Sequence, residues 1–356
     1  MTTNEGPVST ETGPLLGPAE IRALAGRAGI RPTKTLGQNF VLDGGTVRKI
    51  VRGADLVPGE RVVEVGPGLG SLTLGLLEAG ADVVAVEIDP VLAGLLPSTV
   101  QRHVPGARVD VVDLPDVPVP GAGAGAAGRS GAGDDADPGD APAAGAAPTL
   151  TVVRGDALDV RALPGRPPTA MVANLPYNVS VPVLLTFLER FPTLERILVM
   201  VQAEVADRLA APPGSRTYGV PSAKVAWYAS ARRTATIGRS VFWPAPNVDS
   251  ALVRMDRRTP PVTSATREQV FAVVDAAFAQ RRKMIRAALA PIAGSSEAAS
   301  RAVTAAGVDP TARGEQLDVA ALARVAERLP ADALHHRTGA AVGPATRDGG
   351  PGTVEA

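Results

Sequence analysis

The chain has 356 residues, which suits two domains if a domain takes roughly 150 residues. Basic and acidic residues balance at 36 each, so the composition shows no overall basicity. No cysteine is present, which excludes disulfides and thiolate chemistry, and with only three histidines we expect no metal site. Neither a secretory signal nor an apolar run near ~18 residues occurs, so we expect a cytoplasmic protein with no membrane segment.

The chain begins with a polar segment at residues 1–17, rich in Gly, Thr and Pro, which we expect to be a disordered leader. A helical pattern opens at Pro18, with Ile21, Leu24 and Ala25 on one face. Short apolar runs then alternate with helical patterns, which is typical of βαβ units and a mostly parallel sheet. The predicted strands are Arg61–Val65, Asp82–Glu87, Leu150–Arg154, Ala170–Ala173, Arg196–Val201, Ala231–Ile237 and Ala251–Met255.

Two changes in composition divide the rest of the chain. Residues 113–149 consist mostly of Ala, Gly and Pro with several Asp, so we expect a flexible, low-complexity insertion between a helix and the strand before Asp156. The first domain would thus span residues 18–258. Helical patterns at 267–290, 296–306 and 318–329 then predict a small α-helical domain at 259–334, and residues 335–356 are expected to be a disordered tail.

A glycine-rich turn follows the first predicted strand, at Gly66, Gly68 and Gly70. Glycines let a backbone approach a ligand closely, but the dinucleotide fingerprint G-x-G-x-x-G is not met, because a serine takes the place of its third glycine. Glu87 ends the next strand, where a carboxylate can accept both ribose hydroxyls, and Asp156 follows a third strand, where one could accept an adenine amine. This layout resembles that of S-adenosylmethionine-dependent methyltransferases, although a tight turn beside solvated acids would contain the same residues.

Another predicted strand ends in Asn174-Leu175-Pro176-Tyr177. The amino group of adenine is a poor nucleophile, and a site helps it by accepting its N–H bonds, one of them with the Asn174 side-chain oxygen. Pro176 stiffens the loop and has no N–H to compete. Tyr177 offers an aromatic face for a base removed from its stack. An ordinary strand-ending turn is the alternative interpretation of this motif.

Together with further segments, these motifs resemble the rRNA adenine N6-dimethyltransferase family, specifically its KsgA/RsmA branch. The resemblance covers about residues 20–330. It is carried by Leu36–Phe40, Val86–Asp89, Asn174–Ser180, Phe242–Ser250 and Phe278–Lys283. The resemblance implies a Rossmann-like methyltransferase fold followed by a small α-helical rRNA-binding domain, with S-adenosyl-L-methionine as the cofactor. It also implies dimethylation of two adjacent adenosines in the 3′-terminal hairpin of 16S rRNA, within the immature 30S subunit during small-subunit biogenesis, and we expect a monomer.

The resemblance also implies a role for each matching residue. Asn39 and Val41 would line the methionine end of the cofactor, and Gly66 would form the glycine loop. Glu87 would hold the ribose and Asp156 the adenine amine. The predicted catalytic residues, which surround the target base, are Asn174, Leu175, Pro176, Tyr177 and Phe242, with Asn174 also at the cofactor and with Tyr177 and Phe242 on the faces of the flipped adenine.

Local charge supports an RNA partner at two places. Arg22, Arg27, Arg31 and Lys34 carry no acid between them, and Arg281, Arg282, Lys283 and Arg286 are predicted to bind RNA. If the second stretch is helical, these cations share one end of a helix with no carboxylate nearby, an arrangement that favours an external polyanion. The alternative is an ordinary solvated helix face.

Three other functions compete with this hypothesis. A resistance-type 23S rRNA dimethylase would share the cofactor and Asn-Leu-Pro-Tyr motifs, but the Gln280–Lys283 run and the helical C-terminal pattern favour the 16S branch. A DNA adenine methyltransferase is disfavoured because no extra target-recognition segment is present. A non-catalytic assembly factor is disfavoured because Glu87, Asp156 and Asn174 are all in place.

Overall fold

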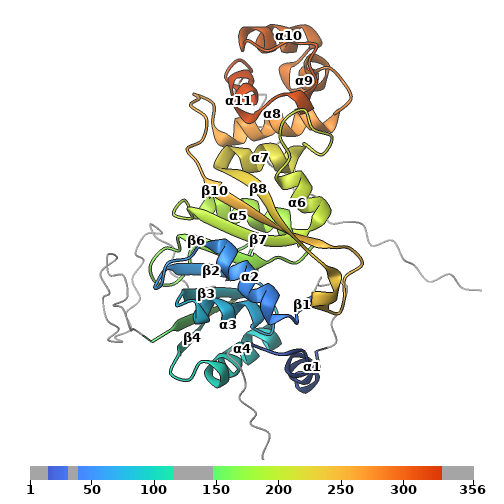
Figure 1. Cartoon of the computed structure of the whole chain (residues 1–356). Helices are drawn as coiled ribbons and strands as arrows, with labels where there is room; N and C mark the ends of the chain where they lie inside the picture. Colours follow the sequence, from blue (N-terminus) through green and yellow to red (C-terminus); the bar gives the residue numbers. More distant parts are fainter. Residues whose placement is uncertain (1–14, 31–38, 115–146, 331–356) are drawn as a thin grey trace, which may run out of the picture. The chain divides into compact units, whose positions relative to one another are not determined.

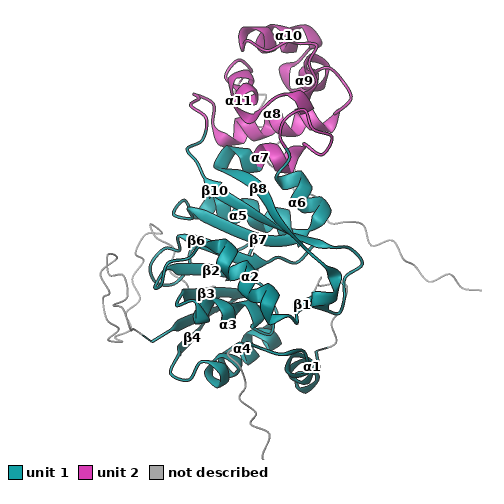
Figure 2. Cartoon of the chain, in the orientation of Figure 1, with its two compact units in different colours: residues 1–211, 225–260 teal, residues 212–224, 261–356 magenta. Residues whose placement is uncertain are grey.

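The computed structural model describes residues 15–30, 39–114 and 147–330, and the chain divides into two compact units (Figure 2). The first unit lies within residues 1–211 and 225–260, and the second within residues 212–224 and 261–356.

The segment 212–224 belongs to the second unit, whereas the sequence pattern places it in the first domain. Tyr218 explains the difference, because its side chain is buried in the second unit. Its hydroxyl donates to the Leu317 carbonyl oxygen at 3.0 Å, and its ring meets Phe278 edge-on at a centroid distance of 5.6 Å. Contacts between residues so far apart in the chain leave no local sequence pattern.

The first unit is built on an eight-stranded sheet (Figure 1). Its strands are β2 (Arg61–Val65), β3 (Asp82–Glu87), β4 (Arg108–Asp113), β5 (Thr149–Arg154), β6 (Ala170–Asn174), β7 (Arg196–Gln202), β8 (Ala229–Ile237) and β10 (Ser250–Arg257), in the order β4-β5-β3-β2-β6-β7-β10-β8. The first six strands in this order, from β4 to β7, run parallel to one another, and β10 pairs antiparallel with β7 and β8. The predicted strands and the mostly parallel α/β sheet are therefore confirmed. The central strands of a parallel sheet are covered by helices on both faces, so in the sequence they appear as mostly apolar runs.

Helices pack on this sheet and close the core. They are α1 (Pro18–Arg27), α2 (Gly44–Ala54), α3 (Ser71–Glu78), α4 (Pro90–His103), α5 (Ser180–Arg190) and α6 (Ala203–Leu209), with a short 3-10 turn η3 (Arg239–Val241). Helix α7 (Val220–Tyr228) begins in the second unit and ends in the first. Side chains of α1 to α4 share one core cluster with sheet residues such as Val62, Val83 and Leu150. A separate pair of short strands, β1 (Phe40–Val41) and β9 (Phe242–Trp243), runs antiparallel.

Two expectations for the first unit are wrong. The insertion follows strand β4 and not a helix. Its predicted bounds are also too wide, because Asp113 belongs to β4 and Thr149 belongs to β5. Strand β4 was missed because it lies at one edge of the sheet, is half-exposed or exposed along its length, and has no continuous apolar run. The predicted leader also extends too far, since Leu16 is 3% exposed in the core. Residues 1–14, 115–146 and 331–356 lie outside the described residues.

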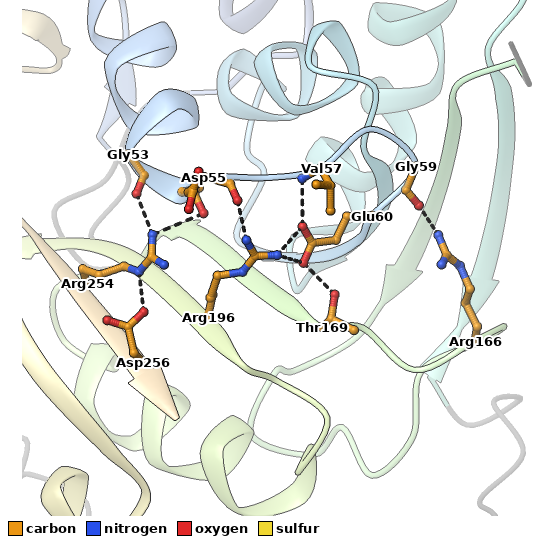
Figure 3. Close-up of polar contacts among 11 residues, drawn as sticks. Gly53, Asp55, Val57, Gly59, Glu60, Arg166, Thr169, Arg196, Arg254 and Asp256 are labelled. Atoms are coloured by element: carbon orange, nitrogen blue, oxygen red, sulfur yellow. Dashed lines mark hydrogen bonds and ion pairs between the residues drawn. The ribbon is translucent and has the colours of Figure 1, made fainter. Parts of the chain in front are cut away.

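A polar network lies where the parallel strands begin and where α2 ends (Figure 3). The Glu60 carboxylate accepts Arg196 Nη2 at 2.5 and 2.6 Å, the Thr169 hydroxyl at 2.7 Å and a backbone N–H at 3.1 Å. Arg254 donates to the Gly53 carbonyl oxygen at 3.1 Å, and Arg196 donates to the Asp55 carbonyl oxygen. Cations are favourable at a helix C-terminus. The network therefore fixes the end of α2, the helix that follows strand β1.

The second unit contains α8 (Arg267–Ala279), α9 (Ile285–Ala293), α10 (Ser296–Ala305), α11 (Val319–Ala326) and the 3-10 turn η4 (Gly314–Gln316). The predicted helical pattern at 267–290 is wrong as one helix, because residues 280–284 form a turn between α8 and α9. Tertiary hydrogen bonds hold the break: Met284 pairs with Arg313, and the Ile285 N–H donates to the Ala312 carbonyl oxygen at 2.7 Å. Within the described ranges, no helix is long and apolar enough to cross a membrane.

Candidate active site

The carboxyl ends of β2, β3, β5 and β6 open on a cavity of about 240 Å³ in the first unit. Ligands of parallel α/β sheets bind at this edge. The cavity is lined by all the predicted cofactor residues, namely Asn39, Val41, Gly66, Glu87, Asp156 and Asn174, and by Leu175, Pro176 and Tyr177. The structure thus brings together residues from five separate segments of the chain.

The glycine loop between β2 and α3 takes a backbone conformation that side chains disfavour. Gly66, Gly68 and Gly70 have φ angles of 71°, 58° and 95°. A Cβ atom at Gly68 would lie 3.0 Å from the Phe40 ring, and one at Gly70 would lie 2.7 Å from a methyl group of Leu96. The loop therefore packs tightly on both sides because these residues lack side chains, and it leads directly into the N-terminus of α3.

Two carboxylates lie beside this loop. Glu87 is 5% exposed; its Oε2 accepts the Gly68 N–H at 3.1 Å and its Oε1 accepts the Asp89 N–H at 3.0 Å. Burial raises the pKa of Glu87 above its ordinary value, and these backbone hydrogen bonds oppose the shift. Asp156 follows β5, and its Oδ1 accepts the Leu158 N–H at 2.8 Å. Both carboxyl groups are therefore held in place by backbone donors.

Asn174 ends β6 and holds the motif residues in register. Its Nδ2 donates to the Asn39 carbonyl oxygen at 3.0 Å, so Oδ1 is the acceptor that the side chain can present to a ligand. The next N–H, from Leu175, donates to the Met200 carbonyl oxygen at 3.1 Å. The Tyr177 hydroxyl shares a hydrogen bond of 2.7 Å with Ser250 Oγ, and burial raises its pKa. The side chains of Asn174 and Tyr177 are thus fixed at the same cavity.

Phe242 does not line the cavity with the other predicted residues. Its side chain is 3% exposed and belongs to the hydrophobic core, while its backbone pairs with Val41. The next residue, Trp243, stacks on Phe40 with ring centroids 6.3 Å apart. In this structure Phe242 therefore supports strand β1 from the core and does not offer a face to a base.

The cavity lining also includes residues that the sequence analysis did not assign to the site, among them Phe40, Glu64 and Ile88. Phe40 packs on the glycine loop, and Ile88 is an exposed apolar side chain, 60% accessible, directly after Glu87. Glu64 is 1% exposed in the middle of the apolar strand β2, which is itself a signal, because a buried carboxyl needs a reason to be there. Within the residues that the structure describes, no group of metal-ligating side chains could hold an ion.

The predicted RNA-binding cluster differs from the expected helical array. Arg281 pairs with Glu315 at 2.6 Å and donates to the Arg216 carbonyl oxygen at 2.5 Å, so the expectation of no nearby carboxylate is wrong. Arg282 and Lys283 are exposed in the turn, and only Arg286 lies on a helix, α9. The N-terminal run is described only at Arg22 and Arg27, which are exposed on α1, while Arg31 and Lys34 lie outside the described residues.

The charge of Arg286 also has a partner. The pKa of Asp309 is lowered, first by its hydrogen bonds with Thr311 and to a lesser extent by the charge of Arg286. Arg282 and Lys283 therefore remain as the best candidates of the predicted cluster for contact with an external anion.

Comparisons with known sequences and solved structures identify proteins that are similar to this chain. The sequence profile of the ribosomal RNA adenine dimethylases matches residues 30–114 and 144–330. The ribosomal RNA small subunit methyltransferase A of Arthrobacter sp. (strain FB24) is 56% identical over 323 residues, covering 90% of this chain and 96% of the relative. A dimethyladenosine transferase from Plasmodium falciparum has a similar fold, with a TM-score of 0.58 at 18% identity, over 80% of this chain and 95% of its own. The 23S rRNA methyltransferase ErmE gives a TM-score of 0.52 at 25% identity, over 82% of this chain and 99% of its own. The chain belongs to the ribosomal RNA adenine dimethylase family.

Proposed function

We propose that this chain transfers methyl groups from S-adenosyl-L-methionine to the N6 amino groups of two adjacent adenosines in the 3′-terminal hairpin of 16S rRNA, within the immature 30S subunit. The observation that carries the proposal is the placing of the Asn174 amide in one cavity with the glycine loop and Glu87. The choice of 16S rRNA is supported by the relative named for the small subunit, at 56% identity. ErmE, which is named for 23S rRNA, is 25% identical.

The cavity residues fit such a donor. Carboxyl groups of Glu64, Glu87 and Asp156 line it, and among its described lining residues none is Lys, Arg or His. A cationic donor with ribose hydroxyls and an adenine amine is matched by acidic acceptors. Glu87 would hold the ribose, Asp156 the adenine amine, and the segment from Asn39 to Val41 the methionine end. When bound, the donor supplies a methyl group on a sulfonium, which is a good leaving group.

The residues beyond the donor would orient the target amine. Asn174 Oδ1 accepts one N–H of the adenine amino group, which makes the nitrogen more pyramidal and turns its lone pair outward. Because Nδ2 is held by Asn39, this acceptor is positioned before the base arrives. The Tyr177 ring, held through its hydroxyl by Ser250, provides a surface for the flipped base, worth ~1–3 kcal/mol per stacked base. The amine loses its proton after attack, so the site needs no strong general base.

The second unit would supply contact with the rRNA backbone. Arg282 and Lys283 are exposed, and the turn that carries them is anchored by the pair between Arg281 and Glu315. A rigid turn presents charges to phosphate at a lower entropic cost than a mobile tail does. Arg281 is therefore assigned to hold the turn, and its two neighbours to contact phosphate.

The test is transfer of labelled methyl groups to 30S particles purified from a strain that lacks this modification and, in a parallel reaction, to purified 23S rRNA, with the modified positions mapped by mass spectrometry. The expected product is two dimethylated adenosines in the 16S hairpin. Modification of 23S rRNA instead would assign the chain to the alternative substrate, and no transfer to either would support a non-catalytic assembly factor. Asn174→Ala should reduce transfer at least 100-fold, by about 3 kcal/mol in the barrier, while the donor still binds.

A further inference from the structure

A buried carboxyl that the proposed reaction does not use lies against the cavity. Glu64 sits on β2 with 1% exposure, and its side chain lines the cavity. The hydroxyl of Thr73, in the first turn of α3, donates to Glu64 Oε2 at 2.6 Å. This hydrogen bond fixes the carboxyl below the glycine loop. Glu64 is thus both removed from water and part of the cavity wall.

On balance, the surroundings of Glu64 oppose its ionisation. The pKa of Glu64 is raised from 4.5 to about 8: desolvation is the largest cause, the hydrogen bond from the Thr73 hydroxyl partly offsets it, and the charge of Glu87 adds to the rise. The other titratable groups that face the cavity are Asp156, which is also acidic, and Tyr177, whose phenol is neutral at pH 7. No described lining residue is basic. Without a ligand, Glu64 therefore keeps its proton near pH 7.

The donor and its product differ in one property that this carboxyl can sense. S-adenosylmethionine carries a positive sulfonium, and after transfer the sulfur is a neutral thioether. A cation close to a buried carboxyl stabilises its ionised form, whereas a neutral sulfur of almost the same shape does not. Hydrogen bonding to the ribose and adenine is common to both molecules and provides no such discrimination.

We propose that Glu64 selects the charged methyl donor over the neutral product by ionising when the donor binds. The O–H bond of its carboxyl breaks, the electron pair stays on the carboxylate, and the proton passes to solvent. When the methyl group leaves, the positive charge is lost, Glu64 takes a proton back, and the hold on the product weakens. This inference rests on the proposed function, because it takes S-adenosylmethionine as the ligand.

The pH dependence follows from the direction of the change. Donor affinity should increase as the pH rises from 6 towards 8, because less free energy is spent on removing the proton, and it should level off above that range. Each unit by which the donor lowers the pKa of Glu64 corresponds to about tenfold in this increase. Product affinity should not share the change, so the preference for donor over product should grow with pH.

Calorimetric titration in two buffers of different ionisation enthalpy measures the protons released on binding. Wild-type protein should release about one proton per donor at pH 7, about half of one at pH 8 and almost none at pH 9.5, with much less released on binding of S-adenosylhomocysteine. Glu64→Gln keeps the size of the side chain and should abolish the difference in proton release between S-adenosylmethionine and S-adenosylhomocysteine. Thr73→Val removes a hydrogen bond that lowers the pKa, so proton release should persist to higher pH.

The outcomes separate this inference from the proposed function. If the donor does not bind at all, the proposed function fails. If the donor binds but releases no more protons than the product does, or if Glu64→Gln releases as many as wild type, Glu64 is not the charge sensor. The Gln variant also controls for the amino group of the donor itself, which it leaves unchanged.

Discussion

Replacing Glu87 by alanine tests the ribose-binding role of its carboxylate. In the structure each of its oxygens already accepts a backbone N–H, from Gly68 at 3.1 Å and from Asp89 at 3.0 Å. These bonds fix the carboxylate and leave lone pairs for two hydroxyl groups. A hydrogen bond to a charged acceptor contributes about 1.5–3 kcal/mol, so losing even one of the two should weaken donor binding roughly 10- to 150-fold, and Glu87→Ala removes both. The two released N–H groups should also cost stability, by about 1–3 kcal/mol each if they stay dry.

The assay is calorimetric measurement of the donor Kd, combined with a melting temperature for each variant. Glu87→Gln serves as a second variant, because its amide keeps the volume but turns an N–H donor towards one of the two backbone donors. Glu204→Ala is the matched control, since it removes a carboxylate with an exposed side chain, 74% accessible, that lies outside the cavity. A Kd within twofold of wild type in both Glu87 variants would remove Glu87 from the site.

The remaining predictions concern the RNA contact, the core and a buried charge. The double change Arg282→Ala with Lys283→Ala should weaken binding to 30S particles, and each lost phosphate contact should flatten the log–log salt dependence by about 0.7–0.9, with donor binding intact. Phe242→Ala should lower the free energy of unfolding by about 3–5 kcal/mol, while Phe242→Leu should cost less than about 1.5 kcal/mol and keep kcat within threefold. Glu64 binds a proton more tightly in the folded than in the unfolded state, since its pKa rises from 4.5 to about 8. The free energy of unfolding should therefore fall as the pH rises between these values, by at most about 1.4 kcal/mol per pH unit. Glu64→Gln should flatten this slope when unfolding is measured by chemical denaturation.

Each of these predictions has an outcome that contradicts it. For the RNA contact, the matched control is Arg301→Ala with Arg328→Ala, which removes the same charge from exposed positions of the second unit; an equal loss of 30S binding would mean that only net charge matters. A large loss of kcat in a stable Phe242→Leu protein would restore the base-stacking role. An unchanged pH slope in Glu64→Gln would mean that Glu64 ionises normally.

The sequence by itself determined the sheet and most of the cavity. Central parallel strands are buried along their whole length and mostly apolar, so Arg61–Val65 and its neighbours are visible as runs. Ligand-binding residues follow directly at the carboxyl ends of these strands. Glycines 66, 68 and 70 could be assigned to a ligand-binding turn because only a residue without a side chain suits that backbone. The motif at Asn174–Tyr177 was specific enough to predict its place beside them.

Only the tertiary structure decided which residues share a surface and which are buried. Phe242 belongs to the core because β9 pairs with β1, a strand far away in the chain. Glu64 lines the cavity because the folded chain brings the end of β2 together with the other cavity segments. Strand β4 has little buried apolar surface, so its pairing with β5 was not visible in the local pattern. The turn at 280–284 interrupts an otherwise helical pattern, since its backbone groups bond to residues 312 and 313 and Arg281 to Glu315. Local periodicity reports how much of a residue is buried, whereas partners, ion pairs and the breaks between helices depend on contacts that only the folded chain makes.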